Sequence, residues 1–132
     1  MKALHCSEHK HQAALCQWWG LQCHRFGIPE NLLFAVPNGG ARNVVTGAIL
    51  KAEGVRRGIP DLFLAVPKDN YHGLFIEMKT ERGHLSKDQK EMIDILQKKG
   101  YDCVVCHGYE KAVAAILRYL TGAKNGTQTK NM

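Results

Sequence analysis

The sequence predicts an α/β protein in which helices flank a mixed β-sheet. Helical and strand-like segments alternate along the 132 residues in the order α-β-α-β-β-α-β-α. Two adjacent central segments have the composition of a hairpin, and the order of the elements implies a mixed sheet flanked by helices. With 45% hydrophobic and 23% charged residues the composition is that of an ordinary globular protein. The length fits one domain, which we expect to span residues 1–122.

The N-terminal part is expected to form a long amphipathic helix, because apolar residues recur at helical spacing from Leu4 to Phe26. Gly27 would end this helix. A short strand is expected at Leu32–Val36, followed by a turn at residues 37–40 and a second helix from Val44 to Glu53.

A β-hairpin is expected next, with strands at Asp61–Val66 and Gly73–Lys79. Both segments are rich in apolar and strand-forming residues, and the Pro67–His72 segment between them contains Pro, Asp and Asn, which favour turns. Ser86 and Gln89 then have the spacing of a capping box, which predicts the start of a third helix.

The third helix is expected to end at Lys98-Lys99-Gly100, and a buried strand is expected at Asp102–His107. A last helix at Tyr109–Leu120 would end at Gly122. Residues 123–132 are rich in Lys, Asn, Thr and Gln and are expected to form a disordered tail.

The charge balance favours a polyanionic partner. Lys and Arg number 18 against 12 Asp and Glu, a net charge of +6, which points to nucleic acid before an anionic membrane. No apolar run approaches the roughly 20 residues of a membrane span, and the first residues lack the apolar stretch of a signal peptide, so we expect a cytoplasmic protein. Five cysteines, an odd number, fit buried thiols in a reducing compartment better than a disulfide framework.

The hairpin brings ionisable residues to one face of the expected sheet. Side chains alternate along a strand, so Phe75, Glu77 and Lys79 share a face. A turn centred near residues 69–70 places Asp61 opposite Glu77 or Lys79 on that face. Glu77 lies in an apolar run, where an unpaired buried carboxylate is costly.

Two interpretations of this cluster are open. One is a buried ion pair of Lys79 with a carboxylate. The other is a divalent-metal site, because two carboxylates and a backbone carbonyl, here that of Met78, are the hard oxygen ligands that suit Mg²⁺ or Mn²⁺. Lys79 would then lie beside the attacking water and offset charge on a phosphorus atom.

These residues form a motif, Gly58-Ile59-Pro60-Asp61 followed by Glu77-Met78-Lys79, that resembles the Pro-Asp…(Asp/Glu)-x-Lys nuclease superfamily. The longer series VPNGGAR, GVRRGIPDL and LSKDQ, at residues 36–42, 54–62 and 85–89, is similar to the virus-type replication-repair nuclease (VRR-NUC) family. The likeness spans about residues 8–120. It implies a restriction-endonuclease-like core, Mg²⁺- or Mn²⁺-dependent hydrolysis of DNA, and a stand-alone form of a domain found mainly in phage and bacterial proteins.

The resemblance also assigns roles to individual residues. Asp61 and Glu77 would bind the metal with the Met78 carbonyl, and Lys79 would act on the attacking water. The family places a further acid on the first helix, for which Glu8 is the candidate because it falls on the helical stripe of Leu4, Leu15 and Trp19. The alternative is that Glu8 is solvated at the helix N-terminus, where the helix dipole favours an acidic residue.

Gln89 has two open interpretations. The capping box alone gives it a structural role in starting the third helix, whereas the resemblance implies that Gln89 belongs to the active site. The resemblance further implies contacts of the DNA backbone with residues near the site, and a solvated surface position is the alternative for each arginine among them. The residues expected to contact DNA are Asn38, Gly39, Arg42, Arg56 and Arg57.

Stand-alone members of the family resemble Holliday-junction resolvases, which implies a homodimer acting on branched or structured DNA. Exposed parts of the first helix near Trp18 and Cys23 are a hypothetical interface, although the same residues could belong to the monomer core.

Two other functions are alternatives. A non-catalytic DNA-binding module with this fold would be expected to have lost Asp61, Glu77 or Lys79, and none is lost. Cys103-x-x-Cys106-His107 resembles half of a zinc or redox site, but residues three apart on a strand face opposite sides, which favours buried thiols.

Overall fold

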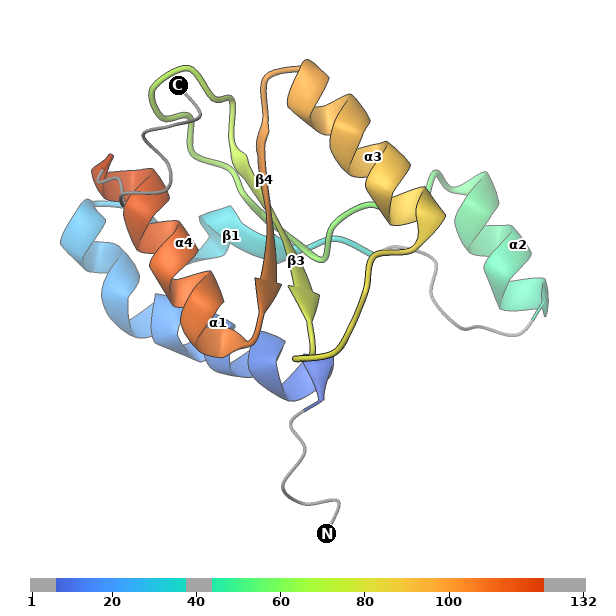
Figure 1. Ribbon diagram of the computed structural model, residues 1–132, viewed down its shortest axis with the longest axis horizontal. Coiled ribbons are helices and arrows are strands. Elements are labelled where there is room, and N and C mark those ends of the chain that lie inside the picture. The colour runs from blue at the N-terminus through green and yellow to red at the C-terminus, as the bar shows by residue number, and fades with distance from the viewer. Residues whose placement is uncertain (1–6, 38–43, 123–132) are drawn as a thin grey trace, which may run out of the picture.

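The computed structural model of the protein describes residues 7–37 and 44–122. These residues form a four-stranded sheet in the order β1-β2-β3-β4 (Figure 1). β1 (Leu33–Ala35), β2 (Leu62–Leu64) and β3 (Leu74–Lys79) pair antiparallel, and β4 (Asp102–His107) pairs parallel to β3. The predicted α/β class with a mixed sheet is confirmed.

Helices lie on both faces of the sheet (Figure 1). α1 (Glu8–Gln22) and α4 (Tyr109–Thr121) pack against each other on one face, and α3 (Lys87–Lys98) packs against β4 on the other. α2 (Val44–Ala52) stands apart from the sheet at one end of the molecule. The face under α3 is the one that carries Phe75, Glu77 and Lys79, because the alternate residues of β3 belong to the core on the opposite face.

The first helix begins at Glu8, four residues later than the start predicted at Leu4. Ser7 has an extended backbone (φ −76°, ψ 164°), and its side chain accepts a hydrogen bond from a backbone N–H of the first turn, so it caps the helix. The 3₁₀ helix η2 (Cys23–Phe26) continues α1 and ends at Gly27, which has a left-handed φ of 70°.

The remaining predicted elements agree with the structure to within two residues at each end. A 3₁₀ helix, η3 (Glu30–Leu32), precedes β1, and β2 is shorter than the predicted strand at Asp61–Val66. The antiparallel pairing nevertheless continues past the strand ends, since Val36 N donates to Asp61 O at 2.8 Å and Ala65 N donates to Leu32 O at 2.8 Å. Most of the predicted turn at residues 37–40, and all of the predicted tail at 123–132, lie outside the described residues.

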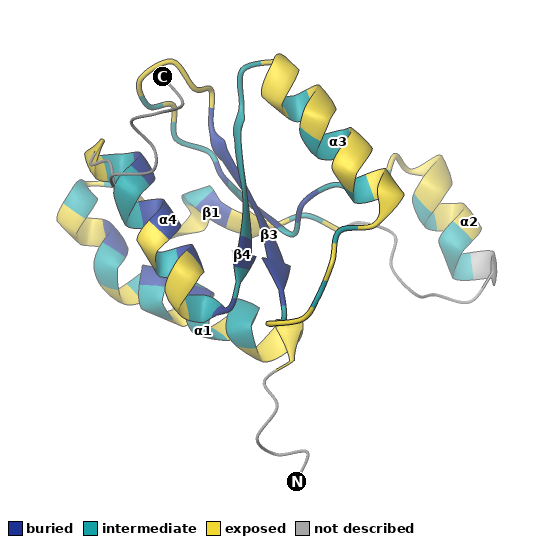
Figure 2. Cartoon of the chain, viewed as in Figure 1, coloured by how far each residue is buried: buried dark blue, intermediate teal, exposed yellow. Residues whose placement is uncertain are grey.

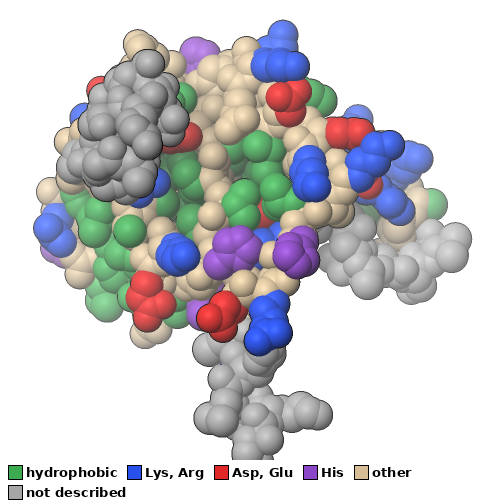
Figure 3. All heavy atoms as spheres, viewed as in Figure 1, with side chains coloured by type: hydrophobic (Ala, Val, Ile, Leu, Met, Phe, Trp, Pro, Cys, Tyr) green, Lys and Arg blue, Asp and Glu red, His purple; other side chains and the backbone are tan. Residues whose placement is uncertain are grey.

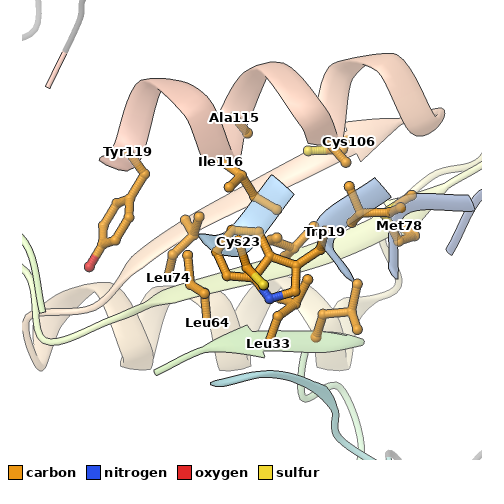
Figure 4. Close-up of a cluster of buried hydrophobic side chains, with 14 residues drawn as sticks. Trp19, Cys23, Leu33, Leu64, Leu74, Met78, Cys106, Ala115, Ile116 and Tyr119 are labelled. Carbon is orange, nitrogen blue, oxygen red and sulfur yellow. The ribbon is translucent and has the colours of Figure 1, made fainter. Parts of the chain in front are cut away.

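The hydrophobic core lies between the sheet and the pair α1 and α4 (Figure 4). Leu15 and Trp19 of α1, Ile76 of β3 and Ile116 of α4 are all at most 1% exposed. Full burial of such a side chain contributes roughly 1.5–3 kcal/mol. Every residue of β3 is buried (Figure 2), so the strand that carries Glu77 and Lys79 is held rigidly from the core side.

The burial of Cys23 and Trp18 bears on the hypothetical dimer interface near these two residues. Cys23 is 6% exposed and belongs to the core, and Trp18 packs against it. Cys23 therefore has the role that the sequence left as the alternative, a residue of the monomer core, and the interface on the exposed parts of the first helix stays a prediction.

The cysteines within the described residues carry free thiols and are buried or half-buried, namely Cys16, Cys23, Cys103 and Cys106. Burial raises the pKa of Cys103 to about 12 and that of Cys106 to about 11. Metal binding and redox exchange need the thiolate, which these environments disfavour. Of the helices in residues 7–37 and 44–122, none is both long and apolar enough to cross a membrane.

Candidate active site

The register between β2 and β3 determines which side chains meet at the site. Leu62 pairs with Ile76 and Phe63 pairs with Phe75. One step further along this register, Asp61 lies opposite Glu77, the first of the two predicted alternatives. The hairpin turn is centred as expected, because the backbones of Lys68 and Tyr71 bond to each other in both directions at 2.9–3.0 Å.

Asp61 is fixed by the backbone of β3. Its Oδ2 accepts a hydrogen bond of 2.8 Å from the Met78 N–H. The neighbours Pro60 and Leu62 are buried on either side of it. Burial raises the pKa of Asp61 above its ordinary value, although the Met78 hydrogen bond and the positive charge of Lys79 act in the opposite direction.

Glu77 is the most deeply buried charged group of the described residues, with its side chain 2% exposed. Its Oε2 accepts a hydrogen bond from Gln89 Nε2 at 3.0 Å and lies 3.7 Å from Lys79 Nζ. Its Oε1 is buried and receives no donor from the described part of the chain. Burial, followed by repulsion from Asp61, raises the pKa of Glu77 to about 8.

Gln89 has both of the roles that the sequence left open. Its Oε1 accepts a hydrogen bond from the Ser86 N–H at 2.8 Å, which completes the capping box of α3. Its Nε2 donates to Glu77 at 3.0 Å. A side-chain amide has separate donor and acceptor atoms, so one residue can start the helix and hold the carboxylate at the same time.

Gly58 allows the segment before Asp61 to approach the start of α3. It has a φ of 81°, and a Cβ added there would collide with the backbone carbonyl of Asp88 and lie 3.0 Å from Gln89 N. The exposed ion pair of Arg57 with Asp88, at 3.8 Å, crosses the same contact. The motif Gly-Ile-Pro-Asp therefore positions both Asp61 and, through α3, Gln89.

Glu8 lies at the first position of α1 and is exposed, although the helical stripe predicted that it would face the core. The stripe is followed from Gln12 onward, but α1 begins at Glu8, where the side chain reaches solvent. Its negative charge still contributes to the raised pKa of Glu77. No three His, Cys, Asp or Glu residues of the described ranges are grouped so that they could hold a metal, so direct ligation by Glu8 stays a prediction.

The residues expected to contact DNA are only partly described. Arg56 and Arg57 are exposed, as a backbone contact requires, whereas Asn38, Gly39 and Arg42 lie outside the described residues. Figure 3 shows Lys and Arg side chains gathered over α2 and the adjacent end of α3. Arg57 is 85% exposed despite its ion pair with Asp88, so its guanidinium remains accessible.

Two histidines near the site were missed by the sequence analysis. His107 pairs with Lys79 in the parallel register of β3 and β4, and its Nδ1 donates to Thr80 O at 2.9 Å. His11 Nδ1 accepts a hydrogen bond from the Tyr109 N–H at 2.9 Å and thereby ties α1 to the start of α4. The parallel register that brings His107 level with Lys79 cannot be derived from residue spacing.

Comparison with known proteins agrees with this geometry. The family model described as the VRR-NUC domain matches residues 2–110. The chain belongs to the VRR-NUC family. A solved structure described as a VRR_NUC domain protein is 25% identical and superposes with a TM-score of 0.73, the match covering 91% of this chain and 93% of that chain. None of the curated proteins compared with the chain matches it.

Membership of the VRR-NUC family confirms the predicted resemblance and indicates a nuclease-type protein, in a family that generally uses divalent metals. The residues of this chain fit such an ion. Asp61 and Glu77 present carboxylate oxygens on one face, and the buried Glu77 Oε1 has no donor among the described residues. A cation there would offset the charge of both carboxylates, whose burial raises the pKa of each.

The raised pKa of Glu77 predicts how metal-free stability depends on pH. Between the ordinary value of 4.5 and about 8 the folded state binds this proton more tightly than the unfolded state does. The free energy of unfolding in EDTA should therefore fall as pH rises through this window, by up to about 1.4 kcal/mol per pH unit. Urea unfolding at several pH values would measure the slope, and Glu77→Gln should flatten it. Equal slopes for both proteins would contradict the assignment.

The close approach at Gly58 predicts an unequal cost of two alanine substitutions. Gly54 and Gly58 both have a positive φ, 100° and 81°, but an added Cβ meets nothing within 4 Å at Gly54. Gly58→Ala should therefore lower the free energy of unfolding by about 1 kcal/mol or more beyond the loss in Gly54→Ala. Urea unfolding of the two variants measures the difference, and equal losses would show that the contact with α3 is not tight.

Proposed function

We propose that this VRR-NUC domain, spanning residues 1–122, is a Mg²⁺- or Mn²⁺-dependent endonuclease that hydrolyses phosphodiester bonds in DNA. The observation that carries this proposal is the Asp61–Glu77 pair, one member of which is 2% exposed, with the Lys79 ammonium 3.7 Å from Glu77. Buried like charges with a single cation beside them are costly to fold. A cation-dependent reaction explains why all three side chains meet.

The ion would be held by Asp61, Glu77 and the Met78 carbonyl, with Glu8 supporting the site through its charge. When bound, it would supply Lewis-acid stabilisation of the charge that builds up on the phosphate. Met78 contributes in two ways, because its N–H already orients Asp61. Gln89 would keep the Glu77 carboxylate in the orientation that presents Oε1.

Lys79 would act directly on the reacting groups. Its ammonium is held beside Glu77 and is 10% exposed at the side chain, so it reaches the site but is shielded from bulk water. It would orient the attacking water and offset negative charge on phosphorus. The water attacks in line with the departing 3′-oxygen, so that the bond from phosphorus to the water oxygen forms as the bond to the 3′-oxygen breaks. The products would carry 5′-phosphate and 3′-hydroxyl ends.

A non-catalytic DNA-binding module is the alternative function. Such a module would use the exposed cations alone, and it would have no need of an acidic pair beneath them. The Glu77 carboxylate repels the phosphates that a binding module must attract. The retained pair therefore favours the enzyme.

The substrate would be positioned by exposed cations near α2 and the start of α3. Phosphate contacts orient the DNA without reading its sequence. Arg42 and the glycine-rich segment at Asn38 and Gly39 are proposed contacts from the family pattern, and the described cations are Lys51, Arg56, Arg57, Lys87 and Lys90.

We also propose that the working unit is a homodimer that acts on branched or structured DNA, in the manner of a Holliday-junction resolvase. Each chain offers one Asp61–Glu77 pair, which supports one cut at a time. A two-fold pair of chains would present two sites to two strands of a pseudo-symmetric junction.

The catalytic proposal predicts large losses of activity without loss of the fold. Asp61→Asn, Glu77→Gln and Lys79→Ala should each lower the cleavage rate by at least about 100-fold, because they remove charge stabilisation in the transition state. Asp94→Asn and Lys98→Ala, which break an exposed ion pair of 2.9 Å on α3, are the matched controls and should cleave normally. The assay is cleavage of labelled DNA with Mg²⁺, Mn²⁺ or EDTA. Full activity in EDTA, or in Lys79→Ala, would contradict the proposal.

The dimer proposal predicts faster cleavage of a four-way junction than of a linear duplex of the same sequence. Sedimentation at micromolar concentration should show a dimer on the junction, and cleavage of the two substrates should differ by at least about tenfold. A monomer in both states with equal rates would contradict the dimer and leave the nuclease proposal intact.

A further inference from the structure

A row of aromatic side chains crosses the face of the sheet that carries the candidate site. Phe34 of β1 pairs with Phe63 of β2, which pairs with Phe75 of β3. Their rings are in contact, with centroids 5.8 Å apart between Phe34 and Phe63 and 4.3 Å apart between Phe63 and Phe75. Tyr101, just before β4, touches Phe63 at 5.9 Å and Phe75 at 5.4 Å. We call these four residues the aromatic row.

The aromatic row lies directly beside the acidic pair. Phe63 follows Asp61 by two residues, and Phe75 precedes Glu77 by two. Two residues along a strand span about 7 Å and return to the same face, so the rings and the carboxylates occupy consecutive levels of the sheet. One nucleotide can reach from a phosphate at the carboxylates to a base at the rings.

Exposure increases along the row toward the edge of the sheet. Phe75 is 8% exposed, Phe63 is half-buried, and Phe34 is 44% exposed. Among the residues that the structure describes, Phe34 has an aromatic neighbour on one side only, and β1 is the edge strand of the sheet that they form. The buried and half-buried rings of the aromatic row thus support the Phe34 side chain, which is exposed to solvent next to the candidate site.

The row is also built to keep its position. A Cβ at Gly73 would lie 2.6 Å from the Phe63 ring, so glycine is required there for this ring to lie across the hairpin. Because the Phe63 ring is fixed in this way, it loses little further conformational freedom when a flat ligand stacks on the neighbouring Phe34 ring.

We propose that the aromatic row is a subsite for an unpaired nucleobase of the DNA substrate, with Phe34 as the stacking ring. This inference rests on the proposed function. Within a duplex, each base presents only its edges in the grooves, so its ring face is not available to a protein side chain. An unpaired base exposes that face, and stacking on aromatic side chains is a common way to bind single strands without reading sequence. The net charge of +6 supplies the attraction for the phosphates on either side.

The substrate class that follows is DNA with unpaired nucleotides at the cut, as in a flap, a gap or the open arm of a branch. A base bound at Phe34 would place the adjoining phosphate at the level of Asp61 and Glu77. A fully paired linear duplex would leave the subsite unused.

Binding by an inactive protein tests the inference apart from catalysis. Asp61→Asn would serve as the background, and fluorescence anisotropy would measure its affinity for a single-stranded oligonucleotide and a blunt duplex. Phe34→Ala should weaken single-strand binding about tenfold and leave duplex binding unchanged, whereas Phe34→Trp should retain both. Leu21→Ala, which truncates an apolar side chain 66% exposed on α1, is the matched control and should bind like the background.

A base analogue gives a second readout that a structural defect would not mimic. 2-Aminopurine placed in turn at each position of the single strand should be quenched at one position by the background protein and by Phe34→Trp, and not by Phe34→Ala. Sedimentation of Phe34→Ala tests whether a second copy of the chain, rather than a nucleobase, contacts this surface. A shift from dimer to monomer would assign Phe34 to contact with a second copy and overturn the subsite.

The remaining outcomes separate this inference from the nuclease proposal. Unchanged single-strand affinity in Phe34→Ala, or equal weakening in Leu21→Ala, overturns the subsite whether or not the wild-type protein cleaves DNA. Absence of cleavage with Mg²⁺ or Mn²⁺ in the wild-type protein overturns the nuclease proposal, while quenching that depends on Phe34 would still support the subsite. Should Phe34→Ala fail to fold, Phe34→Leu keeps the bulk, removes the aromatic ring and gives the same test.

Discussion

A carboxylate that is 2% exposed must find its charge partners and hydrogen-bond donors within the protein, and the elements around Glu77 are arranged to supply them. β3 carries Lys79 on the same face, α3 brings the Gln89 amide to 3.0 Å, and the segment before β2 places Asp61 opposite. This set of partners is incomplete, because Glu77 Oε1 has no hydrogen-bond donor among the described residues and the neighbouring Asp61 is a second carboxylate. The site is therefore polar, negative and shielded at once, which is the environment that a divalent cation requires.

The same constraint explains why β3 is buried on both faces. Its even-numbered residues, such as Ile76 and Met78, fill the core under α1 and α4, and its odd-numbered residues include Glu77 and Lys79 of the candidate site. Movement of the strand would cost core packing before it changed the site. The small helix η2, the cap at Ser7 and the contact between His11 and Tyr109 all stabilise the core side, while α3 is the helix that covers the other side within residues 7–37 and 44–122. An open face above a rigid strand lets a polymer reach buried carboxylates.

The order of the secondary-structure elements and the meeting of Asp61 with the ionisable face of β3 could be predicted from the sequence, because both depend on residues that are close together along the chain. Alternation along β3 and a two-residue turn in the hairpin limit which side chains can face one another, so spacing narrowed the partner of Asp61 to Glu77 or Lys79. The register of the structure selects Glu77. The environment of Glu8 was harder to predict, because the helical stripe predicts the direction in which a side chain faces but not that the helix begins only after the cap at Ser7. The roles of His107 and of the aromatic row depend on how β4 and β1 align with their neighbours. Parallel and edge pairings join distant segments, and spacing within one segment carries no information about them.

Gln89 shows why structure and function cannot be assigned to separate residues at this site. Its amide oxygen stabilises the first turn of α3, and its amide nitrogen holds Glu77. Loss of the side chain would remove a helix cap and leave a buried carboxylate with one donor fewer, so the effect on stability and the effect on ion binding would arise together. Ion binding would in turn affect stability. An ion that binds only the folded state stabilises it by mass action, and here it would add to the positive charge that Lys79 already places beside Glu77. The core under α1 and α4 provides the stability that makes a buried pair of carboxylates tolerable.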